Sequence, residues 1–368
     1  MMDRRIGAQL YNVREFTQDF ENLEQTFEKI HNMGYKTACI VGYGVIAPNH
    51  ADAIVNCDFA ELYAICDNDA EKLEKAKKDY PGVTVYQDYE DVIGDENIEV
   101  VHICTPHYLH GMMAEKALLA GKDVLLEKPV CLNEEDFEKL EKAQDISGKK
   151  VCVCFQNRTN ACVRKMQEEL PALGKIKSLH GTLMWFKDRA YYESGEWRGK
   201  WATEGGGLII NQAIHTIDLL GLLSGGFKSV DATLSTKCLG DFIEVEDTAD
   251  VVFETECGAR ALFFGSNCYP INAPNVVEIH CEKGSLRYTK ETLTLTQDGA
   301  DAVIATDKSV QIGKSYWGSG HYMVINEFYK LLNTGEGEII SLASVKNTMK
   351  TVFALYESGK TNERKTVQ

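Results

Sequence analysis

The feature that most constrains the fold is a strand-like segment that runs into a glycine-rich turn. Residues 37–41 read Thr-Ala-Cys-Ile-Val and lead directly into Gly42-Tyr43-Gly44-Val45-Ile46-Ala47. In a strand–turn–helix unit, the first glycine permits a tight turn and the second lets the backbone approach a pyrophosphate, while a small third residue lets helix and strand pack closely. The free N–H groups at the start of the helix would then face the phosphates. The segment therefore predicts a dinucleotide-binding βαβ unit.

A second predicted strand ends in an acidic residue. Residues 60–67 read Ala-Glu-Leu-Tyr-Ala-Ile-Cys-Asp, so Asp67 stands at the C-terminal end of this strand. A carboxylate at that position can accept hydrogen bonds from both hydroxyls of a ribose and would repel a 2′-phosphate. The pattern predicts NAD as the cofactor, in preference to NADP.

Strand and helix patterns continue to alternate up to about residue 155. Further strands are predicted at 84–86, 100–104, 123–126 and 151–155, and the helices between them at 70–80, 109–120 and 134–146. This alternation is typical of a parallel, doubly wound sheet, which binds ligands at the C-terminal ends of its strands. Thr105 and Pro106 end one of these strands, and His107 and His110 follow as polar residues at a helix start.

Lys128 stands at the end of another predicted strand, in the tripeptide Glu127-Lys128-Pro129. A partly buried ammonium beside a bound cofactor loses hydration, so that its pKa falls and it can exchange a proton with a substrate hydroxyl. Lys128 is therefore the candidate proton carrier. Lys-Pro pairs also occur at ordinary loop edges, so the tripeptide alone does not decide the matter.

Composition narrows the class of protein. A chain of 368 residues that is 44% hydrophobic can bury a large core and suggests two domains. Its formal charge of −16 argues against nucleic acid or an anionic membrane as a partner. No apolar stretch approaches the ~20 residues of a membrane span and no signal-peptide core follows the first residues, which favours a cytoplasmic protein. The cysteines are scattered without a CxxC pair, which indicates buried thiols, with no metal site predicted.

The second half of the chain has a different pattern and a second group of polar residues. Gly205-Gly206-Gly207 would let the backbone approach a ligand, and Asn211, His215 and Asp218 follow on one face of a predicted helix. A histidine aimed at a cleft can act in acid/base chemistry or orient a hydroxyl. The alternative is a buried, satisfied histidine in an amphipathic helix. Asp218 is expected to orient or pack.

Several ordered motifs together resemble the Gfo/Idh/MocA family of sugar and cyclitol oxidoreductases, which includes glucose-fructose oxidoreductase and inositol dehydrogenase. The matching segments are the glycine motif at 42–47, Asp67, residues 104–106, 127–129, 156–158 and 205–207, and His215-Thr216-Ile217-Asp218. The resemblance covers residues 37–368. It implies a Rossmann domain followed by an α+β domain whose open, mostly antiparallel sheet often forms an oligomer interface, here in a homodimer or homotetramer.

The resemblance also implies roles for individual residues. It places Lys128 near the reacting hydroxyl and implies a cis Lys128–Pro129 peptide. The residues that it assigns to the cofactor, together with those derived above, are Gly42, Tyr43, Gly44, Val45, Ile46, Asp67, Thr105, Pro106, His110, Glu127 and Lys128.

The chain departs from inositol dehydrogenase-like members at one position. Those members carry aspartate four residues before the histidine, whereas this chain has Asn211. An amide can hydrogen-bond a hydroxyl but cannot take its proton at neutral pH. The proton role is therefore expected to fall on Lys128, on His215, or on both.

Residues 185–201 are dense in aromatic and charged side chains without a clear period. Such mixtures bind sugars, because aromatic faces stack on C–H faces while charged groups hold hydroxyls. Arg158, Trp197 and Arg198 are the expected substrate contacts, although a loop that braces the two domains is an equal alternative. Residues 314–321 could close the pocket, with His321 either in it or at a helix start.

The first 36 residues lie upstream of the expected Rossmann domain. They read as a β/α unit and resemble the opening of xylose-isomerase-like sugar-phosphate isomerases and epimerases. One unit cannot close a barrel, so an appended segment is expected. The predicted organisation is an appended segment (1–36), an NAD-binding Rossmann domain (37–156), and a substrate-binding and oligomerisation domain (157–368).

Together these features predict an NAD(H)-dependent oxidoreductase acting on a secondary hydroxyl of a sugar, glycoside or cyclitol. Lys128 would carry the hydroxyl proton while the nicotinamide takes the hydride, and His215 with Asn211 would fix the substrate's hydroxyls. Two alternatives remain: a redox-neutral, NAD-dependent glycoside-cleaving enzyme and a non-catalytic NAD-binding sensor.

Overall fold

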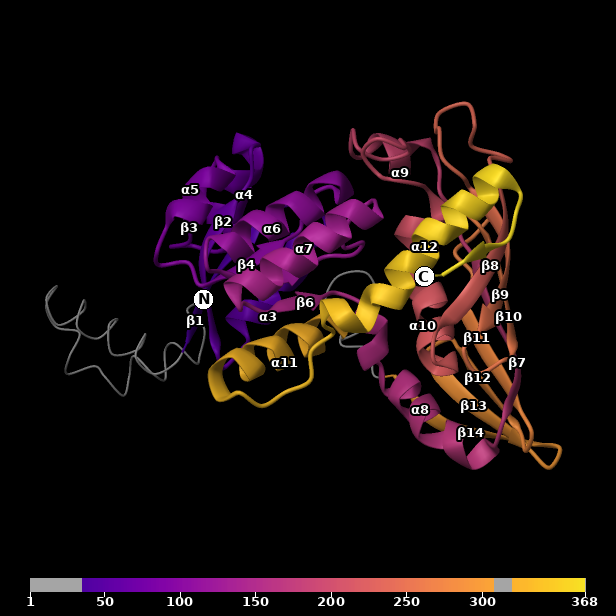
Figure 1. Cartoon of the computed structure of the whole chain (residues 1–368). Helices are drawn as coiled ribbons and strands as arrows, with labels where there is room; N and C mark the ends of the chain where they lie inside the picture. Colours follow the sequence, from indigo (N-terminus) through magenta and orange to yellow (C-terminus); the bar gives the residue numbers. More distant parts are fainter. Residues whose placement is uncertain (1–34, 308–319, 368) are drawn as a thin grey trace, which may run out of the picture.

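The computed structural model describes residues 35–307 and 320–367, which build two sheets with their own helices (Figure 1). The appended β/α unit predicted in residues 1–36 lies almost wholly outside the described residues, as does most of the loop predicted at 314–321. The two sheets stand side by side, and helices lie between them.

The first sheet has six parallel strands in the order β3-β2-β1-β4-β5-β6. The strands are β1 (Lys36–Val41), β2 (Ala60–Cys66), β3 (Thr84–Tyr86), β4 (Val100–Ile103), β5 (Asp123–Leu126) and β6 (Val151–Val153). The strand order reverses between β1 and β4, which pair in parallel, and ligands bind at such a switch point in doubly wound sheets. The predicted Rossmann sheet is confirmed.

The helices of this part follow the strands. They are α3 (Ala47–Val55), α4 (Ala70–Asp79), α5 (Tyr89–Gly94), the short η2 (His107–Leu109), α6 (His110–Leu119) and α7 (Glu134–Ser147). Side chains cap several of them: Asp69 accepts the N–H of Glu71 at the start of α4, and Asn133 accepts that of Asp136 in α7. Helix α7 ends at the left-handed Gly148.

One helix from the end of the chain also covers the first sheet. Helix α11 (Gly320–Thr334) packs against α3 and β1, and its buried face contributes Val324, Ile325, Phe328 and Tyr329 to the same cluster as Ile40. In Figure 1, α11 lies beside α3, away from the second sheet. Helix α11 thus packs on the first sheet although it follows the second sheet in sequence. Hydrophobic spacing predicts that a helix has a buried face but not which sheet it covers.

The second sheet has nine strands in the order β14-β13-β12-β11-β7-β10-β9-β8-β15. The strands are β7 (Ile176–Met184), β8 (Phe227–Ser235), β9 (Thr248–Thr255), β10 (Arg260–Ser266), β11 (Val276–Cys281), β12 (Ser285–Thr289), β13 (Thr292–Gln297), β14 (Ala300–Thr306) and β15 (Lys365–Thr366). Within the described part of this second sheet, β7 and β10 form the one parallel pair, so the predicted open, mostly antiparallel sheet is confirmed.

Helices cover one face of this sheet. The elements of this part are η3 (Gln156–Thr159), α8 (Ala161–Leu173), α9 (Arg189–Glu193), a π-helical turn η4 (Leu208–Ala213), α10 (Ile214–Ser224) and α12 (Leu342–Thr361). Of these, α8, α10 and α12 pack on the sheet. Along β10, Ala261 and Phe263 are buried while Leu262 and Phe264 are exposed, so the opposite face of the sheet is open.

The sequence suggested that the three consecutive glycines, Gly205-Gly206-Gly207, let the backbone approach a ligand. In the structure they lie against other parts of the protein instead. A Cβ atom at Gly205 would meet Leu132, one at Gly206 would meet the Tyr356 hydroxyl, and one at Gly207 would meet the Glu246 carbonyl. Gly205 and Gly206 also have positive φ angles of 82° and 151°. The glycines are required because protein packs tightly on this segment, which leads into η4.

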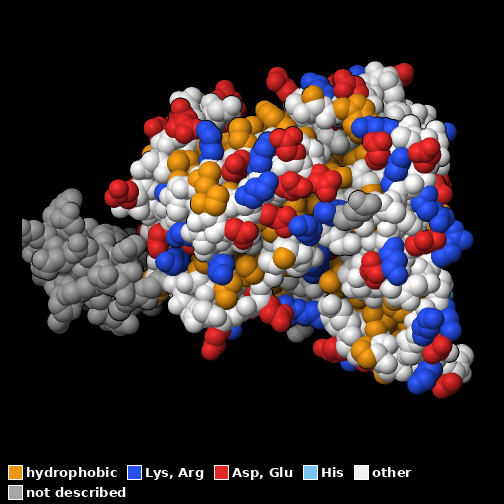
Figure 2. All heavy atoms as spheres, viewed as in Figure 1, with side chains coloured by type: hydrophobic (Ala, Val, Ile, Leu, Met, Phe, Trp, Pro, Cys, Tyr) orange, Lys and Arg blue, Asp and Glu red, His pale blue; other side chains and the backbone are white. Residues whose placement is uncertain are grey.

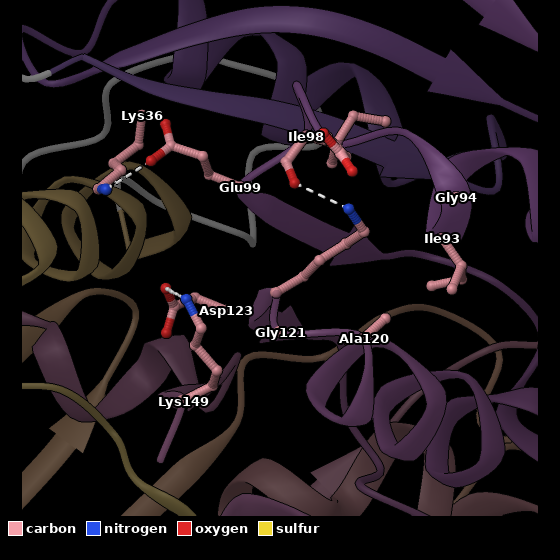
Figure 3. Close-up of a pocket in the computed structure, with 11 residues that line it drawn as sticks. Lys36, Ile93, Gly94, Ile98, Glu99, Ala120, Gly121, Asp123 and Lys149 are labelled. Carbon is pink, nitrogen blue, oxygen red and sulfur yellow. Dashed lines mark hydrogen bonds and ion pairs between the residues drawn. The ribbon is translucent and has the colours of Figure 1, made fainter. Parts of the chain in front are cut away.

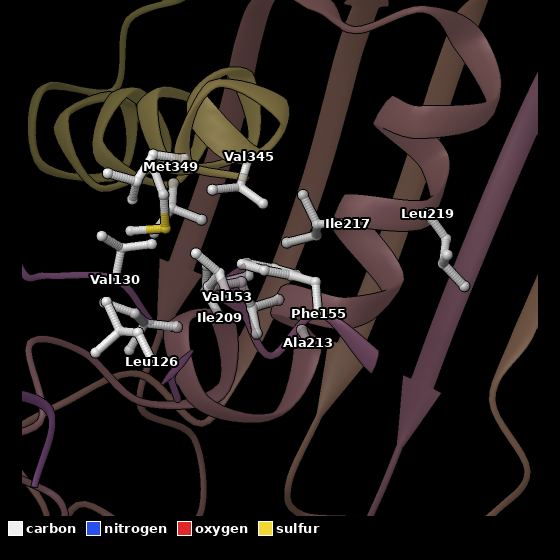
Figure 4. Close-up of a cluster of buried hydrophobic side chains, with 14 of the residues drawn as sticks. Leu126, Val130, Val153, Phe155, Ile209, Ala213, Ile217, Leu219, Val345 and Met349 are labelled. Carbon is white, nitrogen blue, oxygen red and sulfur yellow. The ribbon is translucent and has the colours of Figure 1, made fainter. Parts of the chain in front are cut away.

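A continuous hydrophobic core joins the two domains. It includes Leu126 and Val153 from the first sheet, Ile209 and Ile217 from η4 and α10, and Met349 from α12. Figure 4 shows these side chains converging between the helices and the strands. Because interiors pack densely, this shared core fixes the relative position of the two domains.

The helix lengths, the surface charges and the cysteines of the described residues each bear on the class of protein. None of the described helices is long and apolar enough to cross a bilayer. On the face shown in Figure 2, acidic and basic side chains are interspersed. None of the twelve cysteines, all of which lie among the described residues, forms a disulfide, and eight of them are buried.

Candidate active site

A cavity of about 1270 Å³ lies where the strand ends of the first sheet meet the second domain. Of the predicted site residues, those lining it are Gly42, Tyr43, Gly44, Val45, Ile46, Asp67, Thr105, Pro106, His110, Glu127, Lys128, Trp197, Arg198, Asn211 and His215. Its size exceeds that of typical drug-sized pockets and suits a dinucleotide together with a small substrate.

The glycine turn is built as the sequence predicts. Gly42 has a φ of 88°, and a Cβ there would lie 2.8 Å from the Cys104 carbonyl oxygen, so only glycine fits the turn. Gly44 has no atom within 4 Å of its Cβ position, which leaves open space beside the backbone. Helix α3 begins just beyond, so the positive end of its dipole lies beside the turn, where it favours phosphates.

Asp67 lies buried beside this turn. Its carboxylate accepts the backbone N–H of Tyr43 at 2.7 Å and that of Asp69 at 2.9 Å, while the Lys72 ammonium lies 3.4 Å away. An acidic group therefore faces the cavity close to Gly44, with Lys72 beside it.

Lys128 extends from the end of β5 toward the second domain. Its peptide bond to Pro129 is cis. Its Nζ donates to the backbone carbonyl of Asn211 at 2.9 Å and to the Asn211 Oδ1 at 3.3 Å. Burial lowers the pKa of Lys128 below its usual value, and the negative charge of Glu127 opposes this shift. Lys128 thus combines a cavity position with a pKa moved toward neutrality.

His215 lies on α10, and its Nδ1 is buried without a hydrogen-bond partner. The edge of its ring meets Phe155. Burial, assisted by the nearby Lys128 charge, lowers the pKa of His215 to about 3. The imidazole is therefore neutral at physiological pH and can accept or donate a hydrogen bond. This geometry does not match the alternative of a satisfied core histidine.

The expected common face of three residues is only partly present. Asn211 lies on the π-helical turn η4 and His215 on α10, and both reach the cavity. Asp218 is buried elsewhere, as its expected packing role requires, and accepts the Thr348 hydroxyl at 2.6 Å. A π-helical turn holds more residues than an α-turn, so α-helical spacing does not describe it.

Arg158 is the one predicted site residue that does not line the cavity. Its guanidinium forms a two-pronged ion pair with Asp218, with an Nε–Oδ2 distance of 2.8 Å, and also donates to the Ser344 carbonyl. These contacts join η3, α10 and α12. Asp218 holds Arg158 away from the cavity, and its position gives no support to a substrate contact.

Unsatisfied polar atoms gather in the same cavity. Among the described residues, buried side-chain atoms without a partner include Thr105 Oγ1, Gln156 Oε1, His215 Nδ1 and Asn275 Oδ1, and all four residues line it. Buried polar groups are usually hydrogen-bonded, and each exception calls for an explanation. A polar ligand that supplies the missing partners explains all four.

Glu127 is the centre of a buried network that sequence reasoning missed. Its Oε1 lies 3.0 Å from His50 Nε2 and 3.1 Å from His321 Nε2. Burial would raise the pKa of Glu127, but the hydrogen bonds from His321 and His50 outweigh it and hold the pKa well below its usual range. An ionised carboxylate only accepts, so both ring nitrogens donate to it.

The network continues away from the cavity. His50 Nδ1 lies 3.0 Å from His102 Nδ1, and His102 Nε2 lies 2.7 Å from the Tyr329 hydroxyl. Burial lowers the pKa of His50 and His102, so both are neutral. Because each neutral ring has a single N–H, the direction of each hydrogen bond is determined. Tyr329 donates to His102, His102 donates to His50, and His50 donates to Glu127. No short motif signals this chain, because its members are far apart in sequence.

His110 lines the cavity, but both nitrogens of its ring face backbone carbonyl oxygens. Its Nδ1 lies 2.7 Å from the Pro129 carbonyl oxygen and its Nε2 lies 2.8 Å from that of Thr105. Burial lowers its pKa, although these carbonyls oppose the shift. His110 thus joins the strand end after β4 to the segment after β5.

An aromatic wall closes the side of the cavity in the second domain. The Arg198 guanidinium lies over the rings of Trp197 and Tyr191, at 4.4 and 4.6 Å from their centroids, and Nη1 donates to the Tyr191 hydroxyl at 2.8 Å. The Trp197 ring packs against His107, 4.6 Å away. No local pattern distinguishes Tyr191 from the other aromatic residues of this stretch.

A second, smaller cavity of about 280 Å³ lies at the opposite end of the first sheet (Figure 3). Its charged groups interact with neighbouring protein atoms: Lys36 pairs with Glu99 at 2.6 Å, Lys149 with Asp123 at 3.7 Å, and Lys122 donates to the Ile98 carbonyl. No residue predicted for the site lies in it.

Comparisons with known families match both domains. Residues 36–155 match a family described as oxidoreductase family, NAD-binding Rossmann fold. Residues 164–287 match the GFO/IDH/MocA C-terminal domain. The two matches follow each other in the order of the two sheets.

Individual relatives are similar over different lengths. Levoglucosan dehydrogenase from Pseudarthrobacter phenanthrenivorans is 34% identical over 40% of this chain and 39% of its own length. The NADP(+)-dependent scyllo-inositol 2-dehydrogenase IolW from Bacillus subtilis is 25% identical over 81% of this chain and 78% of its own length. The match to levoglucosan dehydrogenase thus spans well under half of that protein's length.

A solved structure gives a more complete match. The WlbA dehydrogenase from Bordetella pertussis, in complex with NADH and UDP-GlcNAcA, is 28% identical with a TM-score of 0.82. The match covers 90% of this chain and 97% of that chain.

Proposed function

Because this chain belongs to the Gfo/Idh/MocA oxidoreductase family, with an NAD-binding Rossmann domain, we propose that it oxidises or reduces a secondary hydroxyl position of a sugar, glycoside or cyclitol. The observation that carries the proposal is the single cavity that contains the glycine turn, Asp67, Lys128 and His215. When bound, NAD supplies the hydride acceptor or donor.

The residues fit a dinucleotide. The open space beside Gly44 and the start of α3 suit a pyrophosphate, and the Asp67 carboxylate suits ribose hydroxyls. The unpartnered Thr105 hydroxyl lies at the end of β4 in the same cavity and can bind a polar group of the cofactor.

Lys128 is the proton carrier in this proposal. Its lowered pKa lets the neutral amine take the proton of a substrate hydroxyl, and the ammonium returns it in the reverse direction. The carbonyl oxygen and Oδ1 of Asn211 hold the Nζ in place. His215 is neutral, so its role is to orient a hydroxyl through a hydrogen bond.

The test is a substrate screen that follows NADH absorbance. The panel comprises inositols, levoglucosan, free sugars and nucleotide sugars, because the names of relatives and of similar solved structures mention molecules of these kinds. We expect NADH to form in proportion to product with at least one polyol, and Lys128→Met to lower kcat about 100-fold or more while NAD still binds.

The same screen separates the alternatives. Cleavage of a glycoside without net NADH would favour a redox-neutral enzyme. NAD binding without turnover of any polyol would favour a sensor.

The open face of the second sheet supports a further part of the proposal, a homodimer or homotetramer. Leu262 and Phe264 on β10 are 51% and 40% exposed on a face that no described helix covers. Exposed apolar side chains on one sheet face are typical of an interface. Light scattering should give a multiple of the chain mass of 41.1 kDa, and Leu262→Glu with Phe264→Glu should reduce it.

A further inference from the structure

The side-chain amide of Asn211 has two different neighbours. Its Oδ1 accepts the Lys128 Nζ at 3.3 Å, as described above. Its Nδ2 donates to Glu204 Oε1 and, at 3.3 Å, to the Tyr191 hydroxyl. The amide therefore stands between an ammonium on one side and a carboxylate on the other.

Glu204 is fully buried and holds two parts of the site. Its other carboxylate oxygen accepts the backbone N–H of Gly199, and its backbone carbonyl lies 2.9 Å from His107 Nδ1. Glu204 is not among the residues that line the described cavity, so its carboxylate reaches the site through Asn211.

The chemistry of these groups fixes the orientation of the amide. Burial raises the pKa of Glu204, while the hydrogen bonds that it accepts from Gly199 and Asn211 oppose this shift and favour the ionised carboxylate. An ammonium can only donate hydrogen bonds, and an ionised carboxylate can only accept them. The oxygen of Asn211 must therefore face Lys128, and its nitrogen must face Glu204. If the amide were reversed, its N–H groups would face the Lys128 ammonium and its oxygen would face the Glu204 carboxylate. Neither pair can form a hydrogen bond, and unmade hydrogen bonds are costly in a buried place.

We propose that Glu204 is a positioning residue, which fixes the amide of Asn211 and through it the position and charge of Lys128. This inference rests on the proposed function, in which Lys128 carries the proton. The Glu204 charge also raises the pKa of Lys128, against the effect of burial. The amide at position 211 is thus the required partner of a carboxylate at position 204.

A reciprocal exchange tests the proposal. Glu204→Gln alone turns an amide N–H toward either Gly199 or Asn211, both of which donate. Asn211→Asp alone sets two carboxylates against each other. In the double variant, the new carboxylate at position 211 accepts from Lys128 and from the new amide at position 204, whose oxygen accepts from Gly199. Every donor again meets an acceptor.

We expect each single variant to lower kcat by about tenfold or more, and the double variant to return to within about threefold of the wild type. The pH at which kcat reaches half its maximum should move down in Glu204→Gln, because a negative charge is lost near Lys128. It should move up in the double variant, because the carboxylate then contacts Lys128 directly. Glu193→Gln, which removes an exposed carboxylate that does not line the cavity, is the matched control and should change neither value.

Two results would overturn the proposal: a Glu204→Gln enzyme with the wild-type pH profile, or a double variant no better than the product of the two single effects. If Glu204→Gln does not fold, Asn211→Asp and the double variant decide, because only the proposed pairing lets the second change rescue the first. The Tm values of the wild type, the two single variants and the double variant, measured without substrate, provide the same comparison. It tests the pairing even if no polyol is turned over, an outcome that would count against the proposed function alone.

Discussion

At the scale of single residues, burial lowers the pKa of two ionisable groups at the cavity, Lys128 and His215. The pKa of His215 lies at about 3, so this imidazole does not titrate in the working range. The pKa of Lys128 is lowered by burial from its ordinary value of 10.5. Of these two groups, Lys128 is the one whose ionisation can control alcohol oxidation above neutral pH. Of the three expected arrangements, we therefore propose the one in which Lys128 alone carries the proton.

We expect kcat for alcohol oxidation to rise with pH through the pKa of Lys128, because the neutral amine is the base. His215→Ala should lower kcat about tenfold and raise KM, since an orienting hydrogen bond is lost, but the ionisation should persist. Lys128→Met should remove it. Loss of the ionisation in His215→Ala would instead identify the histidine as the titrating group.

Asp67 sets a second expectation, which concerns the cofactor. NAD should bind at least about tenfold more tightly than NADP, a difference of roughly 1.4 kcal/mol, because a 2′-phosphate would face the carboxylate. Asp67→Ala should narrow this gap, since Lys72 then loses its anionic neighbour and can contact the phosphate. Calorimetric titration with both cofactors measures the gap. Glu71→Gln is the control, and equal affinities in the wild type would refute the assignment.

At the scale of elements, the turn η4 depends on tight packing at its start. The Glu246 carboxylate accepts the N–H groups of Gly207 and Ile209, and the Tyr356 hydroxyl donates to it at 2.9 Å. These contacts hold the turn that carries Asn211.

Gly206→Ala should destabilise the protein by more than about 2 kcal/mol, because its Cβ would overlap the Tyr356 hydroxyl and its φ of 151° disfavours any side chain. The loss should appear as a lower Tm and weaker activity together. Gly94→Ala, where nothing lies within 4 Å, should leave the Tm nearly unchanged. A Gly206→Ala protein with the Tm of the wild type would contradict this account.

The sequence predicted most elements of the first sheet closely. The strand expected at 123–126 coincides with β5, and the one expected at 60–67 differs from β2 by one residue. Turn chemistry and hydrophobic period are local properties, so they can be read locally. The π-helical turn, the partner sheet of α11 and the Glu127 network depend on contacts between distant segments, and no local pattern encodes them.

The candidate site shows the same division. Lys128, Asn211 and His215 were found because each belongs to a motif at a strand or helix end. Glu204 and Tyr191 were missed because their significance lies in hydrogen bonds to Asn211. Arg158 was expected at the cavity because nothing in its motif reveals that Asp218 binds it.

At the scale of the whole molecule, buried histidines make stability depend on pH. Burial lowers the pKa of five histidines below the ordinary value of 6.5: His50, His102, His107, His110 and His215. Below pH 6.5 the unfolded chain binds protons that the folded protein does not. Their contribution to stability is therefore complete above pH 6.5 and is lost as the pH falls.

We expect the Tm to fall as the pH is lowered from 7 to 5, with a loss of about 1.4 kcal/mol per pH unit for each histidine kept neutral. Burial raises the pKa of Glu246 to about 7 and also raises that of Glu204, so these two groups act in the opposite direction, but the five histidines outnumber them. Thermal melts across this range provide the measurement. His280→Gln, on the open sheet face, should keep the slope, and a constant Tm would show that these imidazoles can be protonated in place.

The return of α11 to the first sheet has a consequence for how the protein is made. A ribosome releases β1 to β6 long before residues 320–334, yet α11 supplies Phe328 and Tyr329 to the core beneath those strands, and His321 to Glu127. Domains usually fold in the order of their synthesis. Here the nascent Rossmann half must wait, with an apolar face uncovered and the Glu127 carboxylate short of a partner, until nearly the whole chain has emerged. The NAD site is thus completed late in translation, although the glycine turn is among the first of its parts to be made.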